Sequence, residues 1–461
     1  MYDTEPVLDL FAPRKIEHAA AVERHPAPRR VVLVSIDGLA QWVLDSTPQP
    51  NLTRLAREGV TAAVAETVVP SVTLTAHTSM LSGLPPEKHG VTWDRYLPWR
   101  HIRAETIFTR CAKEGLRCGL FAEKPKFAYF AADEPGVEHY EVGSSAEQVF
   151  QRALAWMREA DPDFVMIQIA DIDLTGHSEG WGSELQLHAL ARVDALLGSF
   201  AAAQQAGVRP LTLIVTSAHG GHGTRHGTDL AQDTRIPWIA WGDGAPAGAT
   251  IPSVSTLDTA PTVLLLLGQG VPPEMEGRVR LGGILCDITH VDPSIQVAMR
   301  YAQRDNFLKE AIYPVNRCLL RADVAERLAR VQRRLQAEGL GLRMWDCYRP
   351  QSVQQRMWDL VPDPRYVADP SVGSNHSRAS AVDLTLVDKA GNPLPMPTKH
   401  DDFSVRARRD YMNLPEPVLK NRQILEDAMT AEGFVPLPTE WWHYDDPGWA
   451  NAPLLDEPFG G

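Results

Sequence analysis

The sequence predicts a multidomain chain whose first half is a doubly wound α/β domain with a mainly parallel sheet. The chain has 461 residues, which is too long for one hydrophobic core, because domains usually contain about 100–200 residues. In the first half, short apolar runs alternate with segments of helical periodicity, as in a parallel sheet covered by helices on both faces. Gly and Pro cluster at residues 268–273 and again at Gly282 and Gly283, which marks a junction. We expect a lead-in at 1–29, one domain at 30–280 and another at 285–455.

The expected elements follow from these patterns, in chain order. Strands are expected at the apolar runs 31–36, 118–122, 164–170, 211–216 and 237–241. Helices are expected between them at 51–58, 74–81, 145–159 and 183–202, with Asn51 as the N-cap of the first. Beyond the junction, an amphipathic helix is expected at 321–338 and a strand at 381–387.

Charge and composition exclude some classes of partner. The chain has a net charge of −13 and a pI near 5.6, which argues against nucleic acid, since phosphate binding relies on clustered Lys and Arg. The longest basic cluster, at 327–334, alternates with apolar residues at helical spacing and indicates a solvated helix face. The strongest later apolar run, at 263–267, is too short to span a bilayer. We therefore expect small-molecule substrates; the sequence sets no oligomeric state.

Cysteine use predicts the compartment. The five cysteines are scattered, form no CxxC pair and are odd in number. Such a set favours buried thiols in a reducing compartment over a disulfide framework. Because the first thirty residues contain no apolar core of signal-peptide length, we expect a cytoplasmic protein.

Three side chains near the C-terminus have the residue types of a catalytic zinc site. Zn²⁺ in such sites takes three imidazole or carboxylate ligands and keeps a fourth position for water or substrate. His376, Asp383 and His443 supply that set. A turn or helical bend would place Glu440 on the same side as His443. Because a metal lowers the pKa of its water to about 7 and a nearby carboxylate can accept the proton, Glu440 is the expected general base.

These residues resemble the motifs of the VanX-type D-alanyl-D-alanine dipeptidases. The family's motifs, Ser-x-His-x-x-Gly-x-Ala-x-Asp and Glu-x-x-His, are matched here by Ser374, His376, Ala381, Asp383, Glu440 and His443. The resemblance extends over about residues 286–449. It implies a small α+β domain that binds one zinc ion and hydrolyses a D,D-dipeptide.

The same resemblance implies roles for three further residues. Arg349, within the segment 346–350, would stabilise the oxyanion that forms when the carbonyl becomes tetrahedral. Ser374 and Asp401 would bind the free ammonium of the dipeptide. One position departs from the motif, because Ala379 stands where the family has glycine. If that residue has a positive φ, its Cβ costs roughly 1 kcal/mol.

The first half contains a second group of candidate metal ligands, and ligands in open α/β sheets bind at the carboxyl ends of strands. Thr73 directly precedes the helix expected at 74–81, whose first amides would favour a phosphate. Asp173 and His177 are four residues apart and would share one helical face. The whole group comprises Asp37, Thr73, Asp173, His177, His219 and His226.

This order of residues resembles the alkaline phosphatase superfamily, in its nucleotide pyrophosphatase/phosphodiesterase branch, over about residues 30–277. That family holds two zinc ions. The resemblance implies one site made of Asp173, His177 and His226, and another made of Asp37, His219 and the nucleophile Thr73. Two metals about 4 Å apart can stabilise both the attacking and the leaving oxygen of a phosphoryl transfer, and coordination would activate the Thr73 hydroxyl.

Two positions depart from this second pattern. Ala218 replaces the aspartate of the family's Asp-His-Gly motif, and an alanine cannot coordinate a metal. Asp94 stands where the family has a phosphate-contacting asparagine, and a carboxylate there would repel phosphate. We therefore expect one zinc ion in this half, or two, and weak or absent phosphodiester turnover. The change at Ala218 fits a degenerate domain, a single-metal enzyme with other chemistry, or a deliberate replacement.

The leading hypothesis is a zinc D-Ala-D-Ala dipeptidase, with one zinc ion, fused to a phosphodiesterase-like metal-binding domain. One alternative makes phosphodiester hydrolysis the main activity and the dipeptidase accessory. Another makes the first half a non-catalytic module that binds an anion. Because both halves share one chain, we expect linked steps in cell-wall precursor metabolism.

Overall fold

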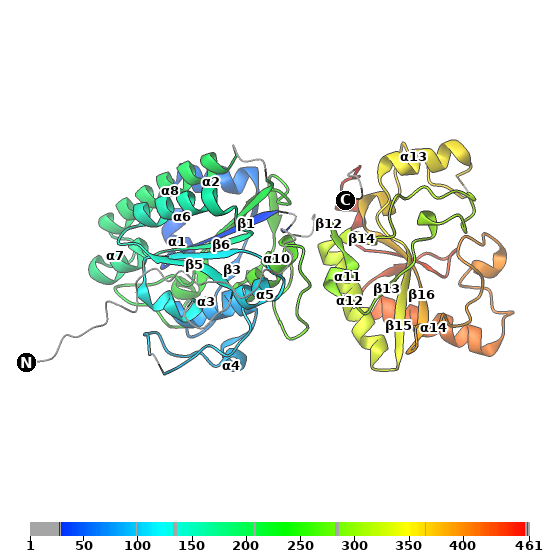
Figure 1. Cartoon of the computed structure of the whole chain (residues 1–461), viewed down its shortest axis with the longest axis horizontal. Coiled ribbons are helices and arrows are strands. Elements are labelled where there is room, and N and C mark those ends of the chain that lie inside the picture. Colours follow the sequence, from blue (N-terminus) through cyan, green and yellow to red (C-terminus); the bar gives the residue numbers. More distant parts are fainter. Residues whose placement is uncertain are drawn as a thin grey trace, which may run out of the picture. The chain divides into compact units, whose positions relative to one another are not determined.

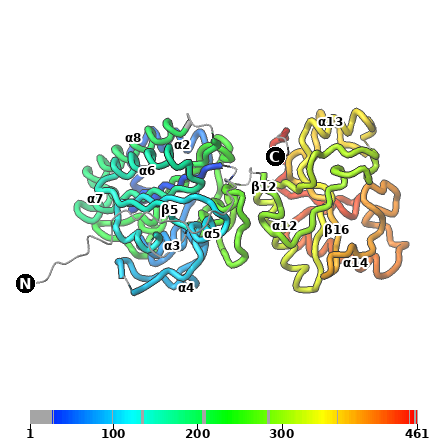
Figure 2. Tube along the Cα trace, viewed as in Figure 1, coloured from blue at the N-terminus to red at the C-terminus, as the bar shows by residue number. Residues whose placement is uncertain are grey.

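The chain divides into two compact units, which Figures 1 and 2 show coloured along the sequence. The computed structural model describes residues 27, 29–97, 99–131, 136–205, 209–281, 285–364, 366–456 and 459. The first unit comprises 1–268 and 272–280, and the second 269–271 and 281–461. Nearly all of the expected lead-in, together with Gly282 and Gly283, lies outside the described residues.

The first unit is built around a twisted, mainly parallel sheet, as the sequence predicted. Its eight strands within the described residues are, in spatial order, β10 (Ala249–Ile251), β2 (Val60–Ala62), β9 (Trp238–Gly242), β7 (Leu211–Thr216), β1 (Arg30–Ile36), β6 (Phe164–Ile169), β4 (Cys118–Ala122) and β5 (Val137–Val142). Strand β9 runs antiparallel to both neighbours, and the other neighbouring pairs are parallel. Strands β4, β6 and β7 are buried along their whole length.

Helices cover both faces of this sheet, as Figure 1 shows. One face carries α2 (Pro50–Glu58), α6 (Ala146–Ala160) and α8 (Glu184–Gln205), and the other α3 (Thr73–Ser82), α5 (Ile107–Lys113) and α10 (Thr259–Leu266). Shorter helices are α1 (Gln41–Ser46), α4 (Pro86–His89), α7 (Asp171–Glu179) and α9 (Ala231–Thr234). A small sheet joins β11 (Val254–Ser255), β3 (Ala65–Glu66) and β8 (Arg235–Ile236).

The start of α2 differs from the prediction. Gln49, not Asn51, is the N-cap residue, and its side chain makes no capping hydrogen bond. Instead the Asp194 carboxylate of α8 accepts hydrogen bonds from the backbone amides of Asn51 and Leu52, at 3.1 and 2.8 Å. The Asn51 side chain also donates to Asp194, at 2.9 Å. The free amides of the first turn are therefore satisfied by a tertiary contact.

The second unit is an α+β domain with a mostly antiparallel sheet. Within the described residues this sheet has five strands, in spatial order β13 (Gln296–Val297), β15 (Leu340–Asp346), β16 (Ala381–Asp388), β18 (His443–Asp445) and β17 (Val435–Pro436). A separate pair joins β12 (Leu285–Asp287) and β14 (Leu319–Arg321). The helices are α11 (Ile288–Val291), α12 (Ala322–Gln336), α13 (Gln351–Leu360) and α14 (Glu416–Ala431). Helix α12 contacts both α14 and β15, which places the apolar core between helices and sheet.

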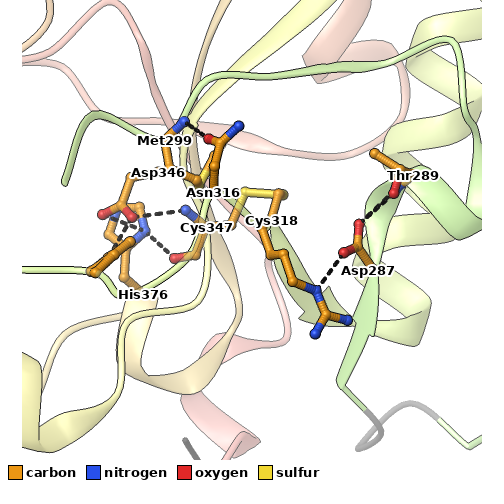
Figure 3. The surroundings of a disulfide bond; sticks show 10 residues. Asp287, Thr289, Met299, Asn316, Cys318, Asp346, Cys347 and His376 are labelled. Atoms are coloured by element: carbon orange, nitrogen blue, oxygen red, sulfur yellow. Dashed lines mark hydrogen bonds and ion pairs between the residues drawn. A yellow bond between two sulfur atoms is a disulfide. The ribbon is translucent and has the colours of Figure 1, made fainter. Parts of the chain in front are cut away.

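A disulfide corrects the interpretation of all five cysteines as thiols. Cys318 and Cys347 are bonded (Figure 3). Cys111, Cys118 and Cys286 are buried free thiols, as predicted. The two cysteines are 29 residues apart, so no short-range spacing in the sequence indicates the bond. Cys318 directly precedes β14 and Cys347 directly follows β15, and the fold brings these two strand ends together. Of the helices in the described residues, none combines the length and apolar character needed to cross a bilayer.

Candidate metal centres

Strand pairing brings together the three expected ligands of the second unit. Asp383 on β16 lies directly opposite His443 on β18 in the antiparallel register, and His376 begins the short 3-10 turn η5 (His376–Arg378) just before β16. The Oδ1 of Asp383 is 2.9 Å from the Nδ1 of His443 and 3.5 Å from the Nε2 of His376. One ligand atom from each residue lies within 4.8 Å of the other two, as a bound ion requires.

Hydrogen bonds on the far side of each ring select the nitrogen that faces the ion. The Nδ1 of His376 lies 2.7 Å from the carbonyl oxygen of Cys347 (Figure 3) and must donate to it, which leaves Nε2 as the ligand atom. The Nε2 of His443 lies 3.0 Å from the Asp445 carboxylate, which leaves Nδ1. Such partners fix the tautomer of a metal-binding imidazole.

The charges of the trio suit a cation. Burial raises the pKa of Asp383, but His376 and the neighbouring imidazoles hold it well below its usual value, so the carboxylate is ionised. Burial lowers the pKa of His443, but Asp383 and Asp445 raise it to about 10. The carboxylates that favour the protonated form of His443 would also attract a divalent ion.

Glu440 lies in the turn between β17 and β18, where its amide donates to the carbonyl of Leu437. The side chain is half-buried. Burial raises its pKa, His443 opposes the rise, and Asp383 adds to it. Glu440 is not one of the three grouped ligand residues, and it precedes His443 by three positions in the chain. Its role as the base stays a prediction.

Arg349 is held as a fixed cation by contacts of both its terminal nitrogens. Its Nη2 is paired with Asp346, its Nη1 donates to Gln354 at 2.8 Å, and the guanidinium lies 5.2 Å from the ring centre of Tyr301. Burial lowers the pKa of Arg349, but Asp346 raises it well above the usual value. The Nε is buried without a hydrogen-bond partner.

The two residues expected to bind an ammonium, Ser374 and Asp401, have different hydrogen-bond partners. Ser374 is buried, and its hydroxyl accepts the backbone amide of His376 at 3.2 Å. Asp401 accepts hydrogen bonds from the Tyr301 hydroxyl at 3.2 Å and lies 3.2 Å from the Nδ1 of His400. Asp401 also has a positive φ of 59°, an uncommon conformation that aspartate adopts more readily than most residues with a side chain.

His400 was not foreseen from the sequence. Its Nε2 lies 3.0 Å from the free oxygen of the ligand Asp383, while its Nδ1 faces Asp401. Burial lowers the pKa of His400, but Asp401 and Asp383 raise it to about 10, so it bridges the two carboxylates as a cation. No spacing motif links His400 to the trio. Its position between Lys399 and the expected site residue Asp401 was the one sequence feature that could have identified it.

In the first unit, the candidate ligands meet where β1, β6 and β7 end. One ligand atom each from Asp173, His219 and His226 lies within 4.8 Å of the others. The Nε2 of His177 is 3.5 Å from Asp173, at the more exposed side of this group. His219 also lies 3.1 Å from Asp37 and 3.3 Å from the Thr73 hydroxyl. The resemblance implied two separate sites, but His219 lies close both to Asp173 and His226 of one site and to Asp37 and Thr73 of the other.

The three histidines present the same ring nitrogen to the centre. Each Nδ1 lies 2.9–3.0 Å from a backbone carbonyl: that of Thr224 for His177, Gly220 for His219 and Ser71 for His226. The Nε2 atoms therefore face the carboxylates. The Oδ1 of Asp173 and the Oδ1 of Asp37 are buried without hydrogen-bond partners. Buried orphan oxygens surrounded by imidazole Nε2 atoms fit a divalent ion.

A lysine that the sequence analysis overlooked lies inside this group. Lys124 lies two residues after the end of β4, and Asp37 lies directly after the end of β1. The Nζ of Lys124 is 2.5 Å from Asp37 and 2.6 Å from Asp173. Its position at a strand end was the signal that could have found it. Burial lowers the pKa of Lys124, but the two carboxylates raise it above the usual value.

The two departures from the expected pattern have different surroundings. Ala218 is fully buried and offers no ligand. Asp94 accepts a hydrogen bond from the Leu74 amide at 2.9 Å, in the first turn of α3, and pairs with Lys126 at 2.8 Å. The charge of Asp94 is therefore balanced by a neighbouring cation. Asp94 also accepts the hydrogen bond of the Leu74 amide, which we expected to face a phosphate.

Two imidazoles and a carboxylate around one point, with a separate glutamate and a buried arginine, define the second unit as a metallohydrolase. A family model described as D-ala-D-ala dipeptidase matches residues 283–459. The chain is 41% identical over 175 residues to the D-alanyl-D-alanine dipeptidase of Escherichia coli (strain K12), covering 38% of this chain and 91% of that relative. Through its second unit, the chain belongs to the D-Ala-D-Ala dipeptidase family.

The first unit matches a different family. The model described as type I phosphodiesterase / nucleotide pyrophosphatase matches residues 31–260. The chain is 27% identical over 228 residues to the human ectonucleotide pyrophosphatase/phosphodiesterase family member 7, covering 44% of this chain and 50% of that relative. A solved structure of human ectonucleotide pyrophosphatase / phosphodiesterase 5 aligns with a TM-score of 0.48 and 18% identity, covering 54% of this chain and 97% of that one. Both resemblances seen in the sequence are confirmed.

Proposed function

We propose that the second unit hydrolyses D-alanyl-D-alanine or a closely related D,D-dipeptide. The observation that supports this most directly is the convergence of His376, Asp383 and His443, each with its ligand atom fixed by an outer hydrogen bond or by strand register. Membership of the dipeptidase family supplies the substrate class.

The side chains around the trio divide the chemistry between them. A zinc ion on the trio would polarise the scissile carbonyl and lower the pKa of the attacking water. The Glu440 carboxylate accepts a proton from that water and afterwards delivers it to the leaving amine. The unpaired Nε of Arg349 donates to the oxygen on which negative charge develops. Asp401, supported by Tyr301 and His400, attracts the free ammonium of the dipeptide, and Ser374 assists as a polar contact.

Replacing the base tests the assignment. Glu440→Gln keeps the shape of the side chain and removes its basicity, so kcat for D-Ala-D-Ala should fall by about 10²–10⁴-fold, while the metal content stays unchanged. Glu416→Gln, an exposed position at the start of α14, is the matched control and should retain full activity. Turnover near that of the wild type in Glu440→Gln would remove Glu440 from the mechanism.

We propose as a second function that the first unit binds a divalent ion and acts on a phosphodiester. The orphan oxygens of Asp37 and Asp173, beside the Thr73 hydroxyl, favour this candidate. Hydrolysis of bis-p-nitrophenyl phosphate by the full chain with Zn²⁺ supplied is the direct assay, with Thr73→Ala as the variant that should abolish it. Phosphodiester binding without turnover would favour the anion-binding module instead.

The shared chain suggests a shared pathway, and we propose linked cytoplasmic steps in cell-wall precursor metabolism. D-Ala-D-Ala is the dipeptide whose consumption the second unit would catalyse, and the first unit would act on a phosphorylated partner in the same route. If the two halves, assayed separately, act on substrates with no common pathway, this link is lost.

A further inference from the structure

Lys124 uses all of its hydrogen-bonding capacity inside the first unit's centre. An ammonium has three donors, and three acceptors surround this one: Asp37 at 2.5 Å, Asp173 at 2.6 Å and the Thr73 hydroxyl at 3.2 Å. The side chain is only 13% exposed. A buried lysine with this partner set is a component of the centre and not a surface charge.

We propose that the Lys124 ammonium is the resident second cation of this centre, so that the first unit takes one divalent ion and not two. The inference rests on the metal site proposed above and specifies its composition. Lys124 would hold Asp37, Asp173 and Thr73 together where a second ion would otherwise have to bind.

The ligands that remain for a second ion are too few. Among the described residues of the first unit, one candidate trio is present, and His219 belongs to it. Asp37 then has Lys124 as its nearest cation. Ala218, the neighbour of His219 in the chain, is buried and offers only a methyl group. A divalent ion competing for Lys124's position would have to displace an ammonium with three satisfied donors.

Charge balance agrees with one ion. The carboxylates of Asp37 and Asp173, the ammonium of Lys124 and one divalent ion leave the centre with a single positive charge, the imidazoles being neutral. A second divalent ion in place of the ammonium would raise that charge, with no further carboxylate to offset it. A single positive charge suits an ester group with one negative charge, such as a phosphodiester.

Lys124 also touches the expected nucleophile. The Thr73 hydroxyl donates to Asp37 at 3.2 Å and accepts from the Lys124 ammonium. A positive group donating to a hydroxyl oxygen favours its ionised form. Lys124 thus gives Thr73 part of the activation that coordination to a second ion would give.

The neighbouring lysine provides a matched control. Lys126, two residues further on, is similarly enclosed but pairs with Asp94 and not with the ligands. Replacing either lysine removes one positive charge from the same segment. Only the change at position 124 should alter how many ions the first unit binds.

Metal content of the full chain, measured by mass spectrometry after dialysis against Zn²⁺, tests the inference. Wild type should contain two ions per chain, one in each unit. Ala218→Asp should still contain two, because Lys124 remains in place. The double variant Ala218→Asp, Lys124→Ala should contain three, and the control Ala218→Asp, Lys126→Ala should contain two.

The alternative outcomes are distinct. Three ions in wild type, or in Ala218→Asp alone, would show that metal displaces Lys124 and would overturn the inference. Two ions in the folded double variant would show that the position is not a cation site, with the same consequence. One ion in wild type that is lost in His443→Ala would mean that the first unit binds none, which would overturn the metal site proposed there and this inference with it.

A measurement on the unaltered chain avoids any variant that fails to fold. Lysine acetylation mapped by mass spectrometry should modify Lys124 slowly both without metal and with Zn²⁺ bound. Lys113, whose side chain is 55% exposed, should react much faster in both states. If zinc expels the ammonium from the carboxylates, acetylation of Lys124 would rise severalfold on loading, and the inference fails.

Discussion

Ala379 has the backbone conformation that its family position demands of glycine. Its φ is 52° and its ψ 32°, in the left-handed region, and the residue is fully buried. The residue lies between His376 and Asp383, and its amide donates to the carbonyl of His376 at 2.9 Å. The strain that the sequence predicted is therefore present beside two candidate metal ligands.

Ala379→Gly should stabilise the second unit. A left-handed residue with a Cβ costs roughly 1–2 kcal/mol, while glycine loses more entropy on folding, so we expect a net gain of about 0.5–1 kcal/mol in the free energy of unfolding. Thermal unfolding measures it. Ala381→Gly, in the regular strand β16, is the control and should destabilise; a loss of stability at position 379 as well would contradict the strain.

As the proposed general base, Glu440 should set the acid limit of the dipeptidase through its raised pKa. Burial raises this pKa above its usual value, and a general base must be ionised to act. As the pH falls through the raised pKa, kcat/KM should therefore decline, at a pH above the usual glutamate range of about 4.3. A pH profile that stays flat down to about 4 would show that no such carboxyl limits the reaction.

At the scale of elements, apolar runs were sufficient to predict the buried strands. Strands β4 and β7 begin and end where the sequence placed them, because every residue in each is buried. Strand β5 was missed because it lies at the sheet edge and only Val137 of its six residues is buried. Burial on both faces leaves a pattern in the sequence, whereas an edge strand does not.

The candidate sites show the same division. The motifs located His376, Asp383 and His443 because their spacing repeats a known ligand order. Lys124 and His400 were missed because each acts through a partner brought close by the fold, and a single lysine or histidine in a loop has no periodicity to reveal it. The roles of all the site residues stay predictions until they are tested.

The disulfide between β14 and β15 gives an element-scale prediction. With Cys318 and Cys347 bonded, alkylation of the unfolded chain without reductant should label three cysteines, and prior reduction should raise the number to five. Intact-mass measurement counts the labels. Five labels before reduction would mean that the pair is reduced, as the predicted cytoplasmic location favours.

At the scale of the whole molecule, each unit contains its own candidate metal centre. An ion that binds only the folded state stabilises it by RT ln(1 + [L]/Kd), about 2.7 kcal/mol at a hundredfold excess over Kd. The metal dependence of unfolding should therefore have two separable parts.

Chelation should reveal both parts in the full chain. EDTA should lower the thermal stability of both units, and in His443→Ala its effect on the second unit should disappear while that on the first persists. Differential scanning calorimetry with and without chelator measures this. His188→Ala, on the exposed side of α8, should behave as wild type; a chelator effect confined to one unit in the wild type would leave the other without metal.

Four of the candidate ligand histidines have their Nδ1 held by the main chain, through the carbonyls of Ser71, Gly220, Thr224 and Cys347. A carbonyl survives every amino-acid replacement. A substitution at any of those four positions cannot remove the carbonyl oxygen that accepts the hydrogen bond and can only shift it. Homologous proteins with the same backbone path would therefore keep the same imidazole orientation, whatever side chains they have at these four positions.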